Sequence, residues 1–543
     1  MRHRLEASGH RFASQSDTET IVHLYEDLGT DCFKHFNGMV AIAIWDSTKD
    51  RLILARDRLG KKPLFYWHDT DRLFFASELK ALRRVSGFPQ EIDYNAIDAY
   101  LTYQYIPHPM TIYKGVHKLP PGHFLILENG RLEIQPYWDI DWSHEAPMSL
   151  QQAKSELRQR LTAAVERRLR SDVPLGAFLS GGIDSSLVCA IAQKMLQTPL
   201  RTFAIGFSEA DFDETQYAAS VAKQLGTEHQ RFEVQPDAVG ILDALVDHYD
   251  EPFSDSSAVP TWYLCELTRK SVTVALSGDG GDELFGGYNR HRLAPALLRR
   301  FGPWPPRCRA SLACLLERLP ASRRGLALDK RRKLAQALRS CSSLDALYHA
   351  LTSSWADPLA LLQPGWAAAV RSTAPPDAAL SPLPSAASAA EQLMLADSLH
   401  YLPDDILTKV DRAAMAASLE TRAPFLDHRV AAIAWQLPLS LKLGPGRSGS
   451  KWALRQLLDR HVPRALLERP KAGFAMPIGP WLRGPLRAWA ADLLDASLLQ
   501  RQGYLQPAPI QRLWQDHLSG RHDHTPALWT VLMWQAWLQQ WQR

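Results

Sequence analysis

The stretch LSGGIDSS, residues 179–186, constrains this chain more than any other segment. An apolar run over 173–179 predicts a buried strand before it, and an amphipathic run over 185–195 predicts a helix after it. Its glycines let the backbone turn tightly and approach a ligand closely. The first turn of a helix exposes unpaired N–H groups at the positive end of its dipole, where anions bind. The segment therefore predicts a phosphate-binding turn between a strand and a helix.

The acidic residue of this turn, Asp184, sets it apart from the common phosphate loops. A carboxylate repels phosphate unless a divalent cation bridges the two groups, so the turn predicts a triphosphate-plus-metal site. The turn also lacks the lysine of G-x-x-x-x-G-K-[ST] and the spacing of G-x-G-x-x-G. The pattern SGGxDS resembles the PP-loop of the N-type ATP pyrophosphatases, which split ATP between its α and β phosphates. A simpler alternative is a Ser/Gly turn that only caps a helix.

A chain of 543 residues is long enough for two domains, and the order of the predicted elements indicates where they divide. The first part is rich in short strands. From about residue 150, helices and strands alternate, which implies a parallel sheet with helices on both faces. Beyond residue 287 the pattern is mostly helical. The expected strands cover 39–45, 51–55, 64–67, 73–76, 174–179, 200–205 and 272–276, and the expected helices cover 18–25, 150–169, 185–195 and 238–250.

Two further segments have distinctive patterns. Residues 92–140 contain several prolines, which predicts a connecting segment wrapped on the surface. Near the end of the chain, Trp534, Trp537 and Trp541 share a helical face. A stacking platform for nucleic acid would interleave basic residues, so this face predicts a buried aromatic stripe.

Composition excludes several classes of function. A net charge of +4 on a chain of this size does not imply a nucleic-acid partner, and apolar runs fall short of membrane-spanning length. The 6 cysteines form no CxxC pair, and no signal peptide follows the basic N-terminus, so we expect a cytoplasmic protein without disulfides or a membrane partner. The oligomeric state stays open, with a homodimer among the options.

A second chemistry-bearing loop, SGDGGDELFGGY, covers residues 277–288 after the predicted strand 272–276. Its 5 glycines and 3 acids lie where open α/β sheets place ligands. Burying clustered carboxylates is costly unless a cation or a proton accompanies them. We expect Asp184 at the same sheet edge, so Asp184 and Asp282 form the natural Mg²⁺ pair and Asp279 is left for another role. The alternative is a Ca²⁺-binding or solvent-exposed acidic loop.

With these loops in place, the chain resembles the glutamine-hydrolysing asparagine synthetases over nearly its whole length. In that family a class II glutamine amidotransferase domain, an antiparallel β-sandwich, precedes a doubly wound, parallel-sheet ATP pyrophosphatase domain with a helical C-terminal part. The resemblance implies an α/β fold with boundaries at 1–149 and 150–543, the first domain being partial. The motifs that carry it, besides the two loops, are SDTE (16–19), NGMVAIAIWD (37–46), LARDRLGKKPLFY (54–66), FASELKAL (75–82), TFAIGF (202–207), DEPFSDSS (250–257), KVDRAAMAASLETRAPFLDH (409–428) and RPKAGF (469–474).

The resemblance implies a ligase that forms β-aspartyl-AMP and pyrophosphate from ATP and aspartate, after which ammonia, supplied from glutamine, displaces AMP to give asparagine. It implies ATP as substrate and Mg²⁺ held by Asp184 and Asp282. The positions that match the family's ATP contacts are Leu179, Ser180, Gly181, Gly182, Asp184, Ser185, Ile205, Ser277 and Gly278.

Two positions match residues that act on the reacting groups in the family. Lys471, in RPKAGF, matches a lysine that stabilises charge on the α-phosphate as it develops. Asp279 matches a position where the family often has glutamate, important for forming and consuming the acyl-adenylate; the acid here is one methylene shorter. Arg422 either clamps a substrate carboxylate or forms a structural ion pair with Glu420 or Asp427. Lys451 and Arg455 lie on a predicted helix of unknown orientation, and we rank them below Lys471.

The N-terminal part departs from the family. The family's nucleophile is an N-terminal cysteine whose own amine acts as base, whereas this chain begins Met1-Arg2-His3. The first cysteine, Cys32, falls where the family has no nucleophile and is expected to be a core or surface thiol. Only Asp17, in SDTE, matches a glutamine-binding position. We expect the recorded start to be wrong or the sequence to be a fragment, because missing strands would leave unpaired sheet edges. Taken literally, the chain would be an ammonia-dependent ligase.

Two alternatives to asparagine synthesis remain open. One is a relative that amidates another carboxylate, such as a uronic acid of a polysaccharide, or closes a β-lactam. The other is a non-catalytic paralogue with a regulatory or partner role, which Ser180, Asp184, Asp282 and Lys471 argue against.

Overall fold

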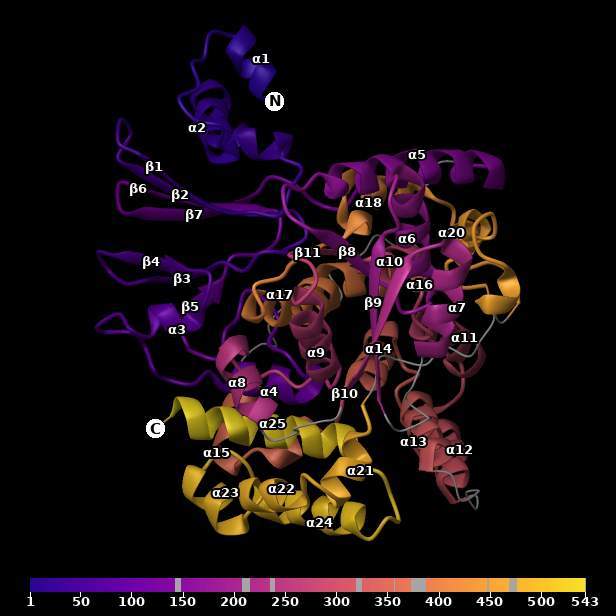
Figure 1. Cartoon of the computed structure of the whole chain (residues 1–543). Coiled ribbons are helices and arrows are strands. Elements are labelled where there is room, and N and C mark those ends of the chain that lie inside the picture. Colours follow the sequence, from indigo (N-terminus) through magenta and orange to yellow (C-terminus); the bar gives the residue numbers. More distant parts are fainter. Residues whose placement is uncertain are drawn as a thin grey trace.

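The structure is a computed structural model that describes residues 1–141, 148–207, 215–234, 240–318, 325–355, 357–372, 387–446, 449–467 and 476–542. Antiparallel sheets form the N-terminal part, a parallel sheet flanked by helices forms the middle, and helices form the C-terminal part (Figure 1). This is the mixed α/β fold that the sequence predicts. We use "N-terminal domain" for residues up to 141 and "synthetase domain" for those from 148.

Two antiparallel sheets build the N-terminal domain, with strand orders β1-β2-β6-β7 and β4-β3-β5. The side chains of β2 alternate: Leu54 packs between the sheets with Tyr66 and Leu125, while Ile53 faces the other way, toward Phe33. Because both faces are covered, β2 is apolar from Leu52 to Ala55, between an arginine at each end. The elements are β1 (Ala41–Asp46), β2 (Arg51–Arg56), β3 (Phe65–His68), β4 (Leu73–Ala76), β5 (Val116–Lys118), β6 (His123–Glu128), β7 (Arg131–Pro136), α1 (Arg2–Ala7), α2 (Asp17–Leu28), η1 (Gly29–His35), α3 (Leu79–Leu82) and α4 (Tyr94–Tyr103).

The prediction of a surface connector over 92–140 is wrong. The segment contains α4, whose Ile97 and Tyr100 are fully buried, and β6, an inner strand that pairs with both β2 and β7. Most of its prolines lie between elements: Pro120 and Pro121 connect β5 to β6, whereas Pro136 is the last residue of β7. The turn residues that separate these short elements resemble, in sequence, those of one continuous loop.

The parallel sheet of the synthetase domain has the order β10-β9-β8-β11-β12. Helices α5 and α6 pack on one face, where Ala177 and Leu276 point, and α8 and α9 pack on the other, where Phe203 and Ala275 point. The sheet is doubly wound, as predicted. Its elements and the first helices around it are α5 (Leu150–Leu169), β8 (Leu175–Phe178), α6 (Ile183–Met195), β9 (Arg201–Phe207), α7 (Thr215–Leu225), β10 (Glu228–Val234), α8 (Gly240–Tyr249), α9 (Ala258–Arg269), β11 (Val274–Leu276), α10 (Gly281–Phe285) and β12 (Glu420–Arg422).

The remaining elements are helical, and Figure 1 shows them below and around the parallel sheet. They are α11 (Arg290–Phe301), α12 (Pro306–Arg318), α13 (Gly325–Arg339), α14 (Leu344–Thr352), η3 (Pro358–Leu361), α15 (Pro364–Ser372), α16 (Ala389–Ala396), the π-helix η4 (Asp397–Leu407), α17 (Thr408–Ala416), η5 (Pro424–Leu426), α18 (His428–Gln436), α19 (Leu439–Lys442), α20 (Trp452–Leu458), η6 (Arg464–Leu466), α21 (Ile478–Arg483), α22 (Arg487–Leu493), α23 (Ala496–Gln502), α24 (Pro507–Leu518) and α25 (Thr525–Trp541). Within the described residues, no helix has the length and apolar character needed to cross a bilayer.

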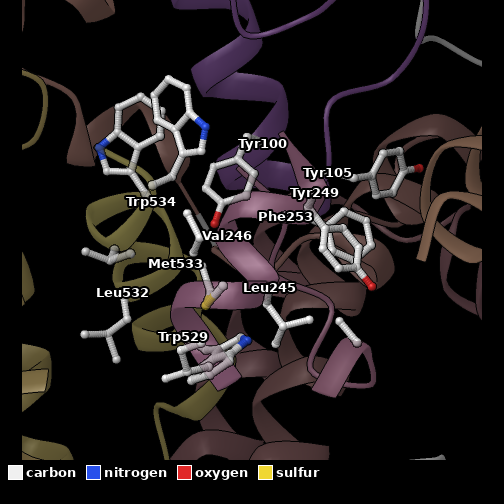
Figure 2. Packing of buried hydrophobic residues seen from close by; sticks show 14 of the residues in the cluster. Tyr100, Tyr105, Leu245, Val246, Tyr249, Phe253, Trp529, Leu532, Met533 and Trp534 are labelled. Carbon is white, nitrogen blue, oxygen red and sulfur yellow. The ribbon is translucent and has the colours of Figure 1, made fainter. Parts of the chain in front are cut away.

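The predicted tryptophan stripe is confirmed as core. Trp534, Trp537 and Trp541 of α25 are buried, and Figure 2 shows Trp534 close to Tyr100 of α4. The hydroxyl of Tyr100 donates to the carbonyl oxygen of Thr530 at 2.7 Å. Helix α25 therefore holds the N-terminal domain to the helical part through one continuous apolar core.

Polar contacts also join the two domains, and we call this set of contacts the domain seam. Lys61 Nζ donates to Thr421 Oγ1 at 3.0 Å, and Lys62 Nζ lies 2.8 Å from Asp411 Oδ1. The remaining seam pairs are Leu79 N with Asp250, Lys118 with Glu251, and His108 with Asp404. The loop GKK of the N-terminal domain thus reaches the parallel sheet at β12.

Candidate active site

The first loop, residues 179–186, follows β8 and leads into α6. Leu179 N donates to the carbonyl oxygen of Phe203 at 2.9 Å, so the strand register continues to the start of the loop. Gly181 then takes a left-handed conformation with φ of 72°, and a Cβ there would lie 2.9 Å from the backbone nitrogen of Ala218. Only glycine fits both constraints. The turn leaves Gly182 as the residue that precedes the first turn of α6.

Hydroxyl groups line the inside of this loop. Ser180 Oγ and Ser185 Oγ lie 3.0 Å apart, and Gly182 N donates to Ser180 Oγ at 3.3 Å. Ser180 is exposed, whereas Ser185 is buried. Ile205 lies buried on the adjacent strand β9. Backbone N–H groups and hydroxyls at the start of a helix form the kind of site that holds phosphate.

The second loop, residues 277–288, follows β11, the neighbour of β8 in the sheet. Ser277 N donates to the carbonyl oxygen of Arg422 at 2.9 Å, and its hydroxyl donates to Asp279 Oδ2 at 2.7 Å. Gly278 packs directly on the first loop, since a Cβ there would lie 2.9 Å from Asp184 Cβ. We call residues 179–186 and 277–288 the paired loops.

The two predicted metal ligands converge on one ammonium group. Lys451 Nζ contacts Asp184 Oδ2 and lies 2.8 Å from Asp282 Oδ1. Burial alone would lower the pKa of Lys451, but the carboxylates of Asp184 and Asp282 raise it well above its usual range. Lys451 immediately precedes α20 in a left-handed conformation with φ of 55°, which is uncommon for a residue with a side chain. The uncommon backbone conformation therefore occurs at the residue whose side chain contacts both Asp184 and Asp282.

Glycines allow this close approach. A Cβ at Gly281 would lie 2.5 Å from Asp184 Cγ, and a Cβ at Gly287 would collide with Asp282 Oδ1 and with Lys451 Cε. Gly281 and Gly287 are therefore required for a steric reason: any larger residue at either position would displace one of the two carboxylates.

The donor set fits a divalent cation. Asp184 and Asp282 together carry two negative charges against the one positive charge of Lys451, and carboxylate oxygens are the ligands that Mg²⁺ prefers. The next acid, Glu283, is buried beside Asp282 and keeps its proton to a higher pH than an exposed glutamate. Burial and the nearby charge of Asp282 raise the pKa of Glu283 to about 7, and the hydroxyl of Tyr288 donates to it at 2.6 Å.

The remaining predicted site residues are Arg422, Asp17 and Lys471. Arg422 Nε donates to Glu420 Oε1 at 2.5 Å, and its Nη1 donates to the carbonyl oxygens of Arg168 and Arg170. This geometry corresponds to the structural ion pair rather than the substrate clamp. Asp17 lies exposed in the first turn of α2. Lys471 lies outside the described residues.

Sequence reasoning did not place Lys451 beside Asp184 and Asp282, and it did not anticipate Lys61. Lys61 is 3% exposed and comes from the N-terminal domain. Burial lowers the pKa of Lys61, and the charges of Asp411 and Asp279 act against that effect. Lys451 stands before an expected helix, but no local pattern tells which way that helix faces. Cys32 is a core thiol: it is fully buried, and burial raises its pKa to about 12.

Comparison with known proteins decides the family. Residues 156–539 match the sequence model of asparagine synthase, and residues 1–138 match that of a glutamine amidotransferase domain. The chain belongs to the asparagine synthetase family. It is 33% identical over 544 residues to asparagine synthetase [glutamine-hydrolyzing] 1 of Bacillus subtilis, covering 99% of this chain and 83% of that relative.

The chain is also similar to two further proteins, one of which is named as an amidase. A putative asparagine synthetase [glutamine-hydrolyzing] of Mycobacterium tuberculosis is 35% identical over 541 residues, with 97% of this chain and 80% of the relative covered. A more distant relative, amidase chyE of Penicillium rubens, is 27% identical over 92% of this chain and 78% of its own length.

Proposed function

We propose that this asparagine synthetase family member amidates the β-carboxylate of aspartate, with glutamine or ammonium as the nitrogen source, and releases asparagine, AMP and pyrophosphate. The observation that carries the proposal is the convergence of Asp184, Asp282 and Lys451 at the carboxyl end of the parallel sheet. Open α/β sheets bind their ligands at that end.

The paired loops supply the contacts that the ATP would need. Ser180, Ser185 and the N–H groups at the start of α6 hold the β- and γ-phosphates as the pyrophosphate leaves. Leu179, Ile205, Ser277 and Gly278 lie at the ends of adjacent strands and bind the adenosine part.

Charge is the main obstacle to the first step, because aspartate and ATP are both anionic. Mg²⁺, held by Asp184 and Asp282, would shield the phosphate oxygens and stabilise the departing pyrophosphate. Lys451 contacts both carboxylates and holds them close together. We assign Lys471 the α-phosphate, where a cation stabilises the charge that develops as the carboxylate oxygen attacks phosphorus.

The second step needs a group that accepts a proton when ammonia attacks the acyl carbon and AMP leaves. Asp279 has the right chemistry, and its charge acts on Lys61 of the N-terminal domain. We therefore assign it that role. Asp17 would bind the α-amino group of glutamine in the N-terminal domain, at a separate site.

The test is pyrophosphate release by the purified full chain with ATP, Mg²⁺ and either ammonium or glutamine. Aspartate-dependent release with matching asparagine formation, measured by mass spectrometry, is the expected result. Release with a uronic acid or a β-lactam precursor and none with aspartate would reassign the acceptor. No ATP binding at all would overturn the ligase assignment and favour a non-catalytic role.

A further inference from the structure

Three potential metal ligands meet at the domain seam, away from the paired loops in sequence. His108 belongs to the segment between α4 and β5 of the N-terminal domain, and His400 and Asp404 belong to the π-helix η4 of the synthetase domain. One ligand atom from each lies within 4.8 Å of the other two. Residues four apart on such a helix project from neighbouring positions, so η4 presents both of its side chains to His108.

Existing contacts already gather these groups. His108 Nδ1 lies 2.7 Å from Asp404 Oδ2, and His108 N donates to the same oxygen at 3.1 Å. The rings of His108 and His400 stack with centroids 5.7 Å apart.

The second observation concerns the ring nitrogens of His400. Both of its ring nitrogens are buried, and neither has a hydrogen-bond partner among the residues that the structure describes. Leaving two buried polar atoms unsatisfied costs free energy, and such groups are normally paired with protein, water or an ion.

We propose that His108, His400 and Asp404 bind a divalent transition ion, Zn²⁺, and that this ion ties the N-terminal domain to the synthetase domain. Two imidazole nitrogens and one carboxylate oxygen, with water as a fourth ligand, are a common tetrahedral zinc set. The set differs from the all-oxygen pair at Asp184 and Asp282, which suits Mg²⁺.

The geometry needs only small changes to accept the ion. Tetrahedral ligands at zinc distances lie about 3.3 Å apart. The 2.7 Å contact between His108 and Asp404 would widen slightly as the metal replaces the shared proton, and the His400 ring would move inward. The side chain of His108 keeps 13% exposure, which gives the ion a path to the site.

Nearby cations do not block the site, because each has other partners. Lys118 pairs with Glu251, and the guanidinium of Arg56 donates to the backbone carbonyls of Gly60, Lys62 and Leu119. The two other clusters of this kind among the described residues are weaker candidates. His10, in the segment before α2, and His23 and Glu26, on α2, form a partly exposed cluster. In the cluster of Asp516, His522 and His524, the guanidinium of Arg332 lies 3.3 Å from His524.

The test uses the full chain after chelator treatment, titrated with Co²⁺ alone and then with Zn²⁺ as competitor. The expected result is one equivalent of Co²⁺ with the visible absorption of a tetrahedral site, displaced by Zn²⁺, and a rise in Tm on adding Zn²⁺. His108→Gln and His400→Gln should each weaken binding by at least about 100-fold. His23→Gln and His522→Gln, which alter the other two clusters, should bind as the wild type does.

Zinc-edge X-ray absorption of the wild-type complex provides a readout that needs no variant. Two imidazole ligands plus oxygen support the site. The proposal is overturned if the wild type shows no tetrahedral Co²⁺ absorption, if His400→Gln binds as tightly as wild type, or if His522→Gln is the variant that loses the metal. Aspartate-dependent pyrophosphate release, which does not involve His400 directly, confirms that each variant is folded.

Discussion

The paired loops and the domain seam both place acidic side chains beside lysine and arginine, but they balance the charge differently. In the seam, Asp250 accepts from Leu79 N at 2.9 Å and lies 3.3 Å from Arg412, and Lys62 pairs with Asp411. At the paired loops, Asp184 and Asp282 share a single ammonium group. The paired loops thus bring two carboxylates to the same lysine, whereas in the seam Asp250 and Asp411 each lie beside a cation from another element.

A third arrangement occurs at Asp98 of α4, which lies near Asp357. Burial, together with the charge of Asp357, raises the pKa of Asp98 to about 6. Burial of this carboxylate therefore favours its protonated form, whereas the acids of the seam and of the paired loops lie beside lysine or arginine.

The largest effect is expected when either carboxylate at the paired loops is neutralised. Asp184→Asn and Asp282→Asn should each lower aspartate-dependent pyrophosphate release at least about 1,000-fold, because both oxygens are needed to hold the metal. The seam variant Asp411→Asn serves as the matched control and should keep activity within about tenfold. Equal losses in all three variants would show that the paired loops and the seam do not differ in kind.

Removing Lys451 should lower the stability of the protein, because the repulsion between Asp184 and Asp282 is then unopposed by this lysine. Lys451→Met leaves two carboxylates together without their cation and should lower the free energy of unfolding by about 3–5 kcal/mol in EDTA. Added Mg²⁺ should restore much of this loss, because it then neutralises the pair. Urea denaturation with and without Mg²⁺ measures both; a loss that Mg²⁺ leaves unchanged contradicts the proposed ion site.

A smaller effect is expected from a methyl group placed between the loops. Gly287→Ala introduces a Cβ that collides with Asp282 and Lys451, so the carboxylate should shift and activity should fall about 10- to 100-fold. Gly365→Ala is the control, since a Cβ there meets nothing within 4 Å. Similar kcat/KM values for the two variants would show that the position of Asp282 is not critical.

The smallest expected effect concerns the proton at Asp98. Its folded-state pKa of about 6 lies above the unfolded value of about 3.9, so the folded state keeps this proton longer as pH rises. The stability contributed by the protonated group is therefore present below about pH 4 and is lost between about pH 4 and pH 6. Asp98→Asn should match wild type at pH 4 and exceed it by about 1–2 kcal/mol at pH 7 in urea denaturation. A difference that does not change with pH would contradict this.

Much of the fold could be predicted from the sequence, because hydrophobic periodicity survives wherever an element is long or fully buried. The expected helix over 150–169 has those same bounds as α5, and the strand before LSGGIDSS is β8. Elements of three to six residues between prolines, such as β5 and β6, were missed because turn residues outnumber the apolar signal there.

Only the part of the site that follows from the order of the strands could be predicted from the sequence. Loops after adjacent parallel strands must meet at one sheet edge, so the convergence of Asp184 and Asp282 followed from chain order. Lys451 comes from a segment more than 150 residues further along the chain, and its direction depends on how α20 packs. His108 and His400 likewise meet only because the two domains dock, which no local pattern records.

The most direct test of the account is a crystal of the full chain grown with Mn²⁺ and α,β-methylene-ATP. The account predicts an anomalous manganese peak about 2.0–2.6 Å from a carboxylate oxygen of both Asp184 and Asp282, bridging to the phosphates. A manganese ion bound by the phosphates alone, or by neither aspartate, would contradict it.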